Sequence, residues 1–246
     1  EQGKSFLLKT APKLQTLFTN HPDIFKIYTP EALSKPLNPF ASLASGIISQ
    51  QVSGAAARSI KKKFLLLYGI DLDAKASPEA PAADKTDIKE HPSRYLFPTP
   101  TQVLATPLDR LRSAGLSARK AEYLHSLSTH FLSSPHLLST TFFLTASNAE
   151  IIKELTQVRG IGEWSVEMFL LFELRRFDVF SMGDLGVQRG CAAWEGVKKG
   201  SGAKGKWKFM TEKEMRECGE RFQPWASLWC LCAWRIGDTG VGSLEG

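Results

Sequence analysis

The sequence lacks any long uncharged apolar run, and none of its hydrophobic stretches approaches the roughly 18 residues that span a membrane. Strand signals are also scarce, whereas apolar residues recur at helical spacing along most of the chain. With 246 residues, of which 43% are hydrophobic and 23% charged, the chain can bury a real core. We therefore predict an all-α protein, arranged as two helical lobes with a cleft between them.

Cysteine is also scarce, because the chain contains only Cys191, Cys218, Cys230 and Cys232. Their spacing fits neither a zinc module nor an iron–sulfur cluster. No secretory leader precedes them, so we expect a reduced, intracellular protein. We expect the four side chains to act as small apolar groups in the core.

Acidic residues are fewer than basic ones, since 25 Asp and Glu stand against 31 Lys and Arg, which gives a net charge of +6. This excess is compatible with a polyanionic partner but does not establish one. Residues 198–208 contain five lysines, three glycines and no acid, and predict a flexible basic loop. Residues 71–94, rich in alanine, proline and charge, predict another loop.

Local capping signals predict where helices begin and end. The pair Asn38-Pro39 starts a helix that stops at SQQVSG (49–54), and a second helix then ends near Gly69. Further helices are predicted over about 101–133 with a break at 115–117, from the capping boxes Ser147/Glu150 and Thr211/Glu214, and through Trp234. We predict a helical N-terminal segment (1–38), a core (39–238) with loop insertions at about 71–94 and 196–210, and a tail (239–246).

The stretch VRGIGEWSVEMF (158–169) joins two predicted helices through a glycine turn. Gly160 and Gly162 permit backbone conformations that other residues avoid, and Ile161 can fill the small core between the helices. The N–H groups that open the second helix would then face an anion such as phosphate. A plain αα-hairpin is the alternative. A dinucleotide-binding turn is disfavoured, because no strand precedes it and Ser165 replaces the third glycine.

The hairpin and the segment after it resemble the helix–hairpin–helix superfamily of base-excision DNA glycosylases, in which a Gly/Pro-containing loop and an aspartate follow the hairpin. Here the loop is FSMGDLG (180–186), and Asp184 matches the catalytic aspartate of the family. The chain is most similar to the alkylation-repair branch, the 3-methyladenine DNA glycosylases. Stretches across roughly Pro39 to Asp238 carry this similarity: NPFASLASGIISQQVSGAAARSI, YLFPTPTQVLATPLDRLRSAGLSARKAEYLHSLS and QPWASLWCLCAWRIGD.

The chain also departs from the pattern of that branch. Arg159 stands where the hairpin usually has a proline, and Met168 corresponds to a tyrosine that is common in the base pocket. The bacterial inducible members carry an extra N-terminal β-rich lobe, for which this chain has no room before the core. The substrate range therefore cannot be transferred from the resemblance.

The resemblance implies a monofunctional glycosylase acting on double-stranded DNA that contains alkylated bases. Such an enzyme flips an alkylated purine, of the 3-methyladenine or 7-methylguanine type, hydrolyses its N-glycosidic bond and leaves an abasic site. Relatives that also cut the strand use a Schiff-base lysine at the position of Trp164, which cannot form an imine. A non-catalytic DNA-binding hairpin is one alternative, and a bifunctional glycosylase/lyase is a second one that Trp164 disfavours.

Asp184 is the expected catalytic residue, because a carboxylate stabilises positive charge on the sugar and orients the attacking water. Its alternative role is the N-cap of the next helix, and Asp178 is its nearest rival. Trp164, Trp234 and Met168 match base-pocket positions, where indole rings favour a cationic alkylated purine. For both tryptophans, a place in the core is the alternative.

The resemblance also assigns contacts with DNA. Gln51 matches the intercalating side chain, and an ordinary exposed turn is the alternative. Backbone binding is assigned to Arg159, Gly160, Gly162, Lys198 and Lys199. No cofactor is expected for catalysis, but hairpins of this family can hold Na⁺ or K⁺ on backbone carbonyls, here those of Thr156, Val158 and Ile161. We expect a monomer without a membrane partner, nuclear in a eukaryote and otherwise cytoplasmic.

Overall fold

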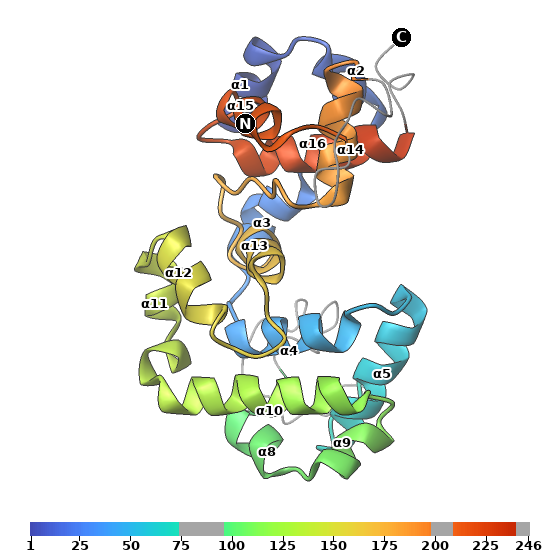
Figure 1. The fold of residues 1–246 in the computed structure, drawn as a ribbon, viewed down its shortest axis with the longest axis vertical. Coiled ribbons are helices and arrows are strands. Elements are labelled where there is room, and N and C mark those ends of the chain that lie inside the picture. The colour runs from blue at the N-terminus through green and yellow to red at the C-terminus, as the bar shows by residue number, and fades with distance from the viewer. Residues whose placement is uncertain (74–95, 198–208, 240–246) are drawn as a thin grey trace. The chain divides into compact units, whose positions relative to one another are not determined.

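The computed structural model describes residues 1–73, 96–197 and 209–239. Within these ranges the chain forms helices joined by turns and contains no strand, which confirms the prediction of an all-α protein (Figure 1). Across the same ranges, no helix is long and apolar enough to cross a membrane. Most of the predicted loop 71–94 and all of the basic stretch 198–208 lie outside the described residues.

The chain divides into two compact units, which we call the terminal unit and the inserted unit. The terminal unit combines Glu1–Lys35 with Leu170–Gly246, and the inserted unit is Pro36–Phe169. The predicted N-terminal segment 1–38 is thus shared between the two units. Its separation from a core at 39–238 stays a prediction.

The inserted unit is built around α10, its longest helix, which packs against α4 and α8. As predicted, α4 starts at the Asn38-Pro39 pair, where the Asn38 side chain accepts a hydrogen bond from the N–H of Ala41 at 3.0 Å. The helices of this unit within the described residues are α4 (Pro39–Ser49), α5 (Gly54–Leu66), α8 (Pro100–Ala105), α9 (Leu108–Ser113), α10 (Ala118–Ser133), α11 (Thr140–Thr145), α12 (Asn148–Leu155), most of α13 (Glu163–Phe172), and the 3₁₀ turn η2 (Pro135–Leu138).

The predicted helical segment 101–133 contains one break more than expected. Besides the break before α10, the chain leaves the helical conformation between α8 and α9, where Thr106 is extended with φ −83° and ψ 123°. Pro107 explains this break, because the proline ring disfavours a helical conformation of the preceding residue.

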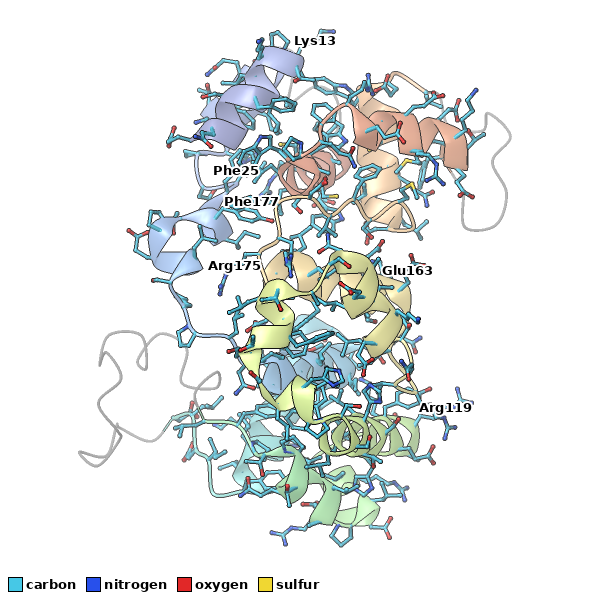
Figure 2. All side chains as sticks on the ribbon, turned by 90° about the vertical axis from the view of Figure 1, so that its left-hand side faces the viewer. Lys13, Phe25, Arg119, Glu163, Arg175 and Phe177 are labelled. Carbon is cyan, nitrogen blue, oxygen red and sulfur yellow. The ribbon has the colours of Figure 1, made fainter. Side chains whose placement is uncertain are left out.

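The terminal unit draws its core from both of its separate chain segments. Apolar side chains of α1 and α2 are buried together with those of α15 and α16, among them Leu7, Leu14, Met215 and Trp229, and with Phe222 from the turn between α15 and α16. Phe177, labelled in Figure 2, lies 5.0 Å from the ring of Tyr28 and 5.1 Å from that of Trp225. The helices are α1 (Gln2–Thr10), α2 (Leu14–Asn20), α3 (Pro30–Leu33), α14 (Leu185–Trp194), α15 (Glu212–Glu220), α16 (Ala226–Thr239) and the 3₁₀ turn η1 (Lys26–Tyr28).

All four cysteines are buried in the terminal unit and form no disulfide, which confirms their predicted place in the core. Among the described residues, no group of three or more His, Cys, Asp or Glu side chains is arranged to hold a metal ion. The cysteines therefore contribute packing volume to this core.

Helices α14 and α16 cross at a distance that only glycine allows. A Cβ atom at Gly190 would lie 1.8 Å from the backbone oxygen of Ala233. A Cβ atom at Gly237 would lie 3.0 Å from the backbone oxygen of Gly186 and 3.2 Å from the nitrogen of Gly190. Glycines on the facing sides of α14 and α16 thus allow the two backbones to come into contact (Figure 1).

We predict that Gly190→Ala destabilises the protein by about 3 kcal/mol, at the upper end of the usual cost of overpacking. The added methyl group would meet a backbone oxygen, which cannot rotate away as a side chain could. Urea unfolding followed by circular dichroism measures the loss.

The matched control is Gly46→Ala, because Gly46 also lies inside a helix but has no atom within 4 Å of the position that a methyl group would take. Alanine there should stabilise the protein by about 0.5–1 kcal/mol through its better helix propensity. Equal stability of the two variants would show that α14 and α16 cross less closely than described.

Candidate functional site

The hairpin joins α12 to α13 through residues 156–162. As predicted, Ser147 and Glu150 form a capping box at the start of α12. Ile161 is buried, as expected of a side chain that fills the space between the helices. Gly160 has φ +92°, a left-handed conformation that favours glycine. The site residue Gly162 is exposed, and a Cβ atom there would meet nothing within 4 Å, so its surroundings leave room for a close approach.

Two side chains of helix α10 contact this turn. The Tyr123 ring packs so closely on Gly160 that a Cβ atom at that glycine would lie 2.3 Å from the ring. The Ser126 hydroxyl accepts a hydrogen bond from the N–H of Arg159 at 3.2 Å. The hairpin turn, residues 157–162, is therefore held against a helix that lies far from it in the sequence.

Arg159 replaces the usual proline with a charge that already has partners. Its Nη1 lies 3.1 Å from the Glu122 carboxylate, and its guanidinium lies 5.9 Å from the Tyr123 ring centre. Both charged side chains are substantially exposed, so the ion pair contributes little stability. The carboxylate nevertheless competes with any other anion for this guanidinium. Arg119, which precedes Glu122 by one turn of α10, is exposed and extends into solvent (Figure 2).

A hollow of about 730 Å³ in the inserted unit brings several predicted site residues together. Gln51, Trp164 and Met168 all line it, beside the hairpin turn. The remaining lining residues are Gly46, Ser49, Gln50, Ser117, Arg119, Lys120, Tyr123, Gly160 and Ser165. Trp164 is 50% exposed, so its alternative assignment to the core is wrong.

The turn at residues 49–53, which we call the wedge turn, presents Gln51 in an unusual conformation. Gln51 has φ +55°, and a left-handed conformation of a residue other than glycine costs roughly 1–2 kcal/mol. Its side chain is exposed, whereas the amide of the preceding Gln50 donates a hydrogen bond to the Gly160 carbonyl at 3.0 Å. The two neighbouring glutamines therefore have different environments.

Asp184 lies in the terminal unit at the N-cap of α14. Its Oδ1 accepts a hydrogen bond from the N–H of Val187 at 2.9 Å and a second from the indole N–H of Trp234 at 2.7 Å. The alternative role as a helix cap is thus present, together with an additional side-chain contact that a cap does not need. The rival Asp178 lies before the loop and is exposed.

Trp234 is partly buried, and an aromatic neighbour that the sequence analysis missed lies against it. The ring of Phe172 stacks on Trp234 at 5.7 Å with an interplanar angle of 15°, and Phe172 is 42% exposed. Its spacing was a usable signal, because Phe172 follows Met168 by four residues on α13. Gly186 makes room for the indole, since a Cβ atom there would lie 2.6 Å from the Trp234 ring.

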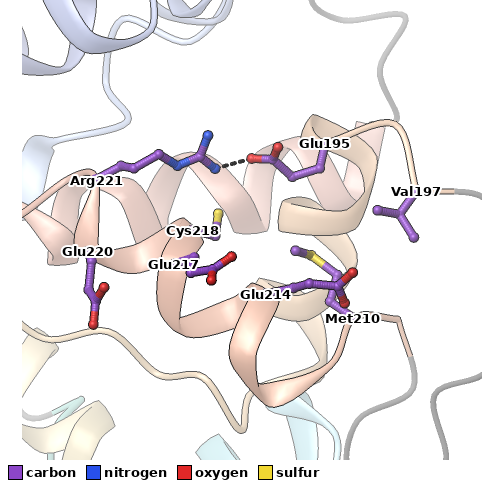
Figure 3. A pocket seen from close by; sticks show the side chains of 8 residues that line it. All are labelled: Glu195, Val197, Met210, Glu214, Glu217, Cys218, Glu220 and Arg221. Carbon is purple, nitrogen blue, oxygen red and sulfur yellow. Dashed lines mark hydrogen bonds and ion pairs between the residues drawn. The ribbon is translucent and has the colours of Figure 1, made fainter.

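A hollow of about 610 Å³ in the terminal unit has a different character (Figure 3). Glu214, Glu217 and Glu220 line it, and an ion pair joins Glu195 to Arg221 beside Cys218. Glu195 follows the last residue of α14, whereas Asp184 precedes its first, so this acidic hollow and the aspartate lie at opposite ends of that helix. Its carboxylates make it unsuitable for a phosphate group.

Two remaining predictions are not tested by this structure. The carbonyl of Val158 accepts a hydrogen bond from the N–H of Ile161 at 3.0 Å, and a monovalent cation on the carbonyls of Thr156, Val158 and Ile161 stays a prediction. Lys198 and Lys199 lie outside the described residues, so their predicted role in DNA binding also stays a prediction.

Comparison with known proteins places most of the sequence in one family. A family model described as "HhH-GPD superfamily base excision DNA repair protein" matches residues 44–218. The chain is 33% identical to the DNA-3-methyladenine glycosylase of Saccharomyces cerevisiae, over 83% of this chain and 69% of that protein. It is 30% identical to DNA-3-methyladenine glycosylase 1 of Schizosaccharomyces pombe, over 66% of this chain and 60% of that protein.

Solved structures show the same fold. The DNA-3-methyladenine glycosidase of Bacillus halodurans is similar with a TM-score of 0.62 and 29% identity, covering 93% of this chain and 90% of that one. The 3-methyladenine DNA glycosylase of Schizosaccharomyces pombe, solved in complex with abasic DNA, has a TM-score of 0.58 and 24% identity, covering 94% and 97%. These likenesses agree with the helical hairpin architecture described above.

We predict that Asp184→Ala lowers the free energy of unfolding by about 1–2 kcal/mol, because both hydrogen bonds to Oδ1 are lost. Asp184→Asn keeps a carbonyl oxygen at that position and should cost less than half as much. Urea unfolding followed by tryptophan fluorescence compares the two variants. Equal losses would mean that the negative charge, and not the acceptor oxygen, holds α14 and Trp234.

Proposed function

Because the chain belongs to the HhH-GPD superfamily of base excision DNA repair proteins, we propose that it is a monofunctional glycosylase for alkylated purines. It hydrolyses the N-glycosidic bond of bases of the 3-methyladenine and 7-methylguanine type in double-stranded DNA and leaves an abasic site. The observation that carries this proposal is the carboxylate of Asp184, fixed in the loop after the hairpin by the indole N–H of Trp234.

In this mechanism Asp184 acts on the charge that develops when the bond to the base breaks. The sugar becomes cationic, and a carboxylate facing it lowers the energy of the transition state and orients the attacking water. The two hydrogen bonds to Oδ1 fix the direction of the carboxylate before the substrate arrives. A preorganised charge of this kind needs no rearrangement at the moment of reaction.

Each of the two units contains its own group of candidate base-binding side chains. Trp234 and Phe172 form one stacked, partly exposed pair in the terminal unit, and Trp164 and Met168 line the hollow of the inserted unit. An alkylated purine is cationic or electron-poor, so an electron-rich indole face attracts it more strongly than a normal base. Flipping also costs less for a damaged base, because such a base stacks and pairs less well.

Strand cleavage is not expected from this site. Trp164 occupies the position of the Schiff-base lysine of lyase relatives, and Glu163 precedes it. Lys120 does line the same hollow, and burial lowers the pKa of its amine. Its Nζ, however, donates a hydrogen bond to the Ile48 carbonyl at 2.7 Å, which assigns the amine a structural role.

The partner in this proposal is duplex DNA, bound through its phosphates at the hairpin turn. The open surroundings of Gly162 and the charge of Arg159 support this assignment, and Gln51 is the side chain that fills the space of the flipped base. A Na⁺ or K⁺ ion on the hairpin carbonyls and the lysines 198 and 199 would add to the grip on phosphate. A monomeric state and a nuclear location in a eukaryote belong to the same proposal.

The experiment that tests the function is release of free bases from methylated duplex DNA, analysed by chromatography. Free 3-methyladenine or 7-methylguanine supports the proposed glycosylase. Binding without release would instead indicate a non-catalytic hairpin module. DNA strand breaks that appear without alkali treatment would indicate a lyase.

We predict that Asp184→Asn lowers the single-turnover rate of excision at least about a hundredfold, because one electrostatic group in such a site commonly contributes that much. The asparagine oxygen can still accept the hydrogen bonds from Val187 and Trp234, so the fold should persist. The loss should be smaller for 7-methylguanine, which leaves partly unaided, than for a neutral base.

Asp178→Asn is the matched control, because it removes the same charge from an exposed position in the same chain segment. Its excision rate should stay close to that of the unaltered protein. A large loss in Asp178→Asn with little change in Asp184→Asn would transfer the catalytic role to Asp178.

We predict that Glu122→Gln strengthens binding to undamaged duplex DNA, by up to about fivefold, since an exposed ion pair holds its partner only weakly. The guanidinium of Arg159 then loses its competing carboxylate and can bind a phosphate. Fluorescence anisotropy at several salt concentrations should also show a steeper salt dependence.

Asp109→Asn controls for the change in net charge, because Asp109 forms a similar exposed pair with Arg112 on α9 at 2.9 Å. That variant should bind DNA almost as the unaltered protein does. Equal gains in both variants would attribute the effect to net charge and remove the specific role of the Glu122–Arg159 pair.

A further inference from the structure

A single side chain connects the two turns that are proposed to act on DNA. The Gln50 amide, in the wedge turn, donates a hydrogen bond to the carbonyl of Gly160 in the hairpin turn at 3.0 Å. The two residues are 110 positions apart in the sequence. Gly160 is the residue of the hairpin turn with φ +92°, so Gln50 binds a carbonyl whose direction depends on that left-handed conformation.

Helix α10 supports both turns from the same side. Lys120 donates to the carbonyl of Ile48 near the end of α4, at 2.7 Å, directly before the wedge turn. Tyr123 packs on Gly160, and Ser126 accepts the N–H of Arg159, both in the hairpin turn. The three side chains follow one another at intervals of three residues, so they share one side of the helix.

Gln51, with its left-handed conformation, stands between two residues whose side chains make hydrogen bonds to backbone atoms. On one side stands Gln50, held by Gly160. On the other side Ser53 caps α5, and its hydroxyl accepts a hydrogen bond from the N–H of Ala56 at 3.3 Å. An unfavourable backbone conformation persists only where its surroundings determine it in this way.

From this arrangement we infer that Gln50 is a positioning residue, which couples the wedge turn to the hairpin turn so that base extrusion and phosphate binding occur on one rigid element. The inference rests on the proposed function, because it gives Gln51 and the hairpin the roles assigned there. This role does not require Gln50 to touch the base or the sugar. It acts by keeping the backbone of Gln51 in its left-handed conformation and at a fixed position relative to the hairpin turn.

The test replaces Gln50 with leucine, which keeps a similar volume but cannot donate a hydrogen bond. Extrusion is measured with a fluorescent base analogue in duplex DNA, and excision with single-turnover rates on methylated DNA. The extent of extrusion and the excision rate should each fall about three- to tenfold, because the net free energy of one hydrogen bond changes an equilibrium constant by about that factor. The thermal midpoint should fall by only a few degrees and the affinity for undamaged DNA should change little, so the loss of activity lies in the step after binding.

Gln15→Leu is the matched control, because the amide of Gln15 also donates a hydrogen bond, to the hydroxyl of Thr19 at 3.5 Å, but Gln15 belongs to α2 and to neither of the two turns. It should leave extrusion and excision unchanged. A double-mutant cycle with Gln51→Ala then separates positioning from general stability. If Gln50 acts through Gln51, Gln50→Leu should cause no further loss of extrusion once Gln51 is alanine.

The possible failures can be told apart. If the unaltered protein extrudes and excises bases and Gln50→Leu equals it, or if the effects of the two variants add, the positioning role is overturned and the proposed function stands. If the unaltered protein extrudes the analogue but releases no base, the glycosylase assignment fails, and the extrusion cycle alone decides the role of Gln50. If it extrudes nothing, both are overturned.

Discussion

The terminal unit depends on the close crossing of α14 and α16. Gly190 lies against the backbone of Ala233, and the next residue along α16 is Trp234, whose indole reaches Asp184 at the start of α14. The separation of the two helix axes therefore sets the separation of the carboxylate from its hydrogen-bond donor. Two side chains with a proposed chemical role are positioned by residues that have no side chain at all.

In the inserted unit, the corresponding constraint is the attachment of two irregular turns to one straight helix. Turns gain little stability from their own contacts, and both Gln51 and Gly160 adopt left-handed backbone conformations. Side chains of α10 compensate by binding the backbone at the hairpin turn and at the end of α4, directly before the wedge turn. The same helix carries Glu122, so it both supports the hairpin turn and occupies the guanidinium of Arg159.

Local signals allowed much of this fold to be predicted from the sequence. Asn38, Ser147 and Thr211 each cap a helix where expected, because capping depends on residues within one turn. The break at Thr106 was missed although Pro107 signals it. The hydrogen bond from Gln50 to Gly160 could not be predicted, since no periodicity relates residues so far apart.

The same limit applies to the candidate site. The resemblance identified Asp184, Trp234 and Trp164 from motif positions, but it gave no reason to pair the first two through an indole N–H. Phe172 escaped notice because an apolar residue at the end of a helix ordinarily belongs to the core. Its partial exposure depends on the neighbouring elements, which only the three-dimensional structure reveals.

The terminal unit is built from two separate segments of the chain, and this has a consequence for its folding during synthesis. Leu7, Leu14 and Phe18 are buried against helices that begin only at Leu185, so their partners leave the ribosome long after they do. The inserted unit is complete by Phe169 and can fold earlier, as an autonomous block within an unfinished domain. Until α14 to α16 emerge, the apolar faces of α1 and α2 lack the side chains that bury them, and closing this long-range contact is expected to be the slow step of folding.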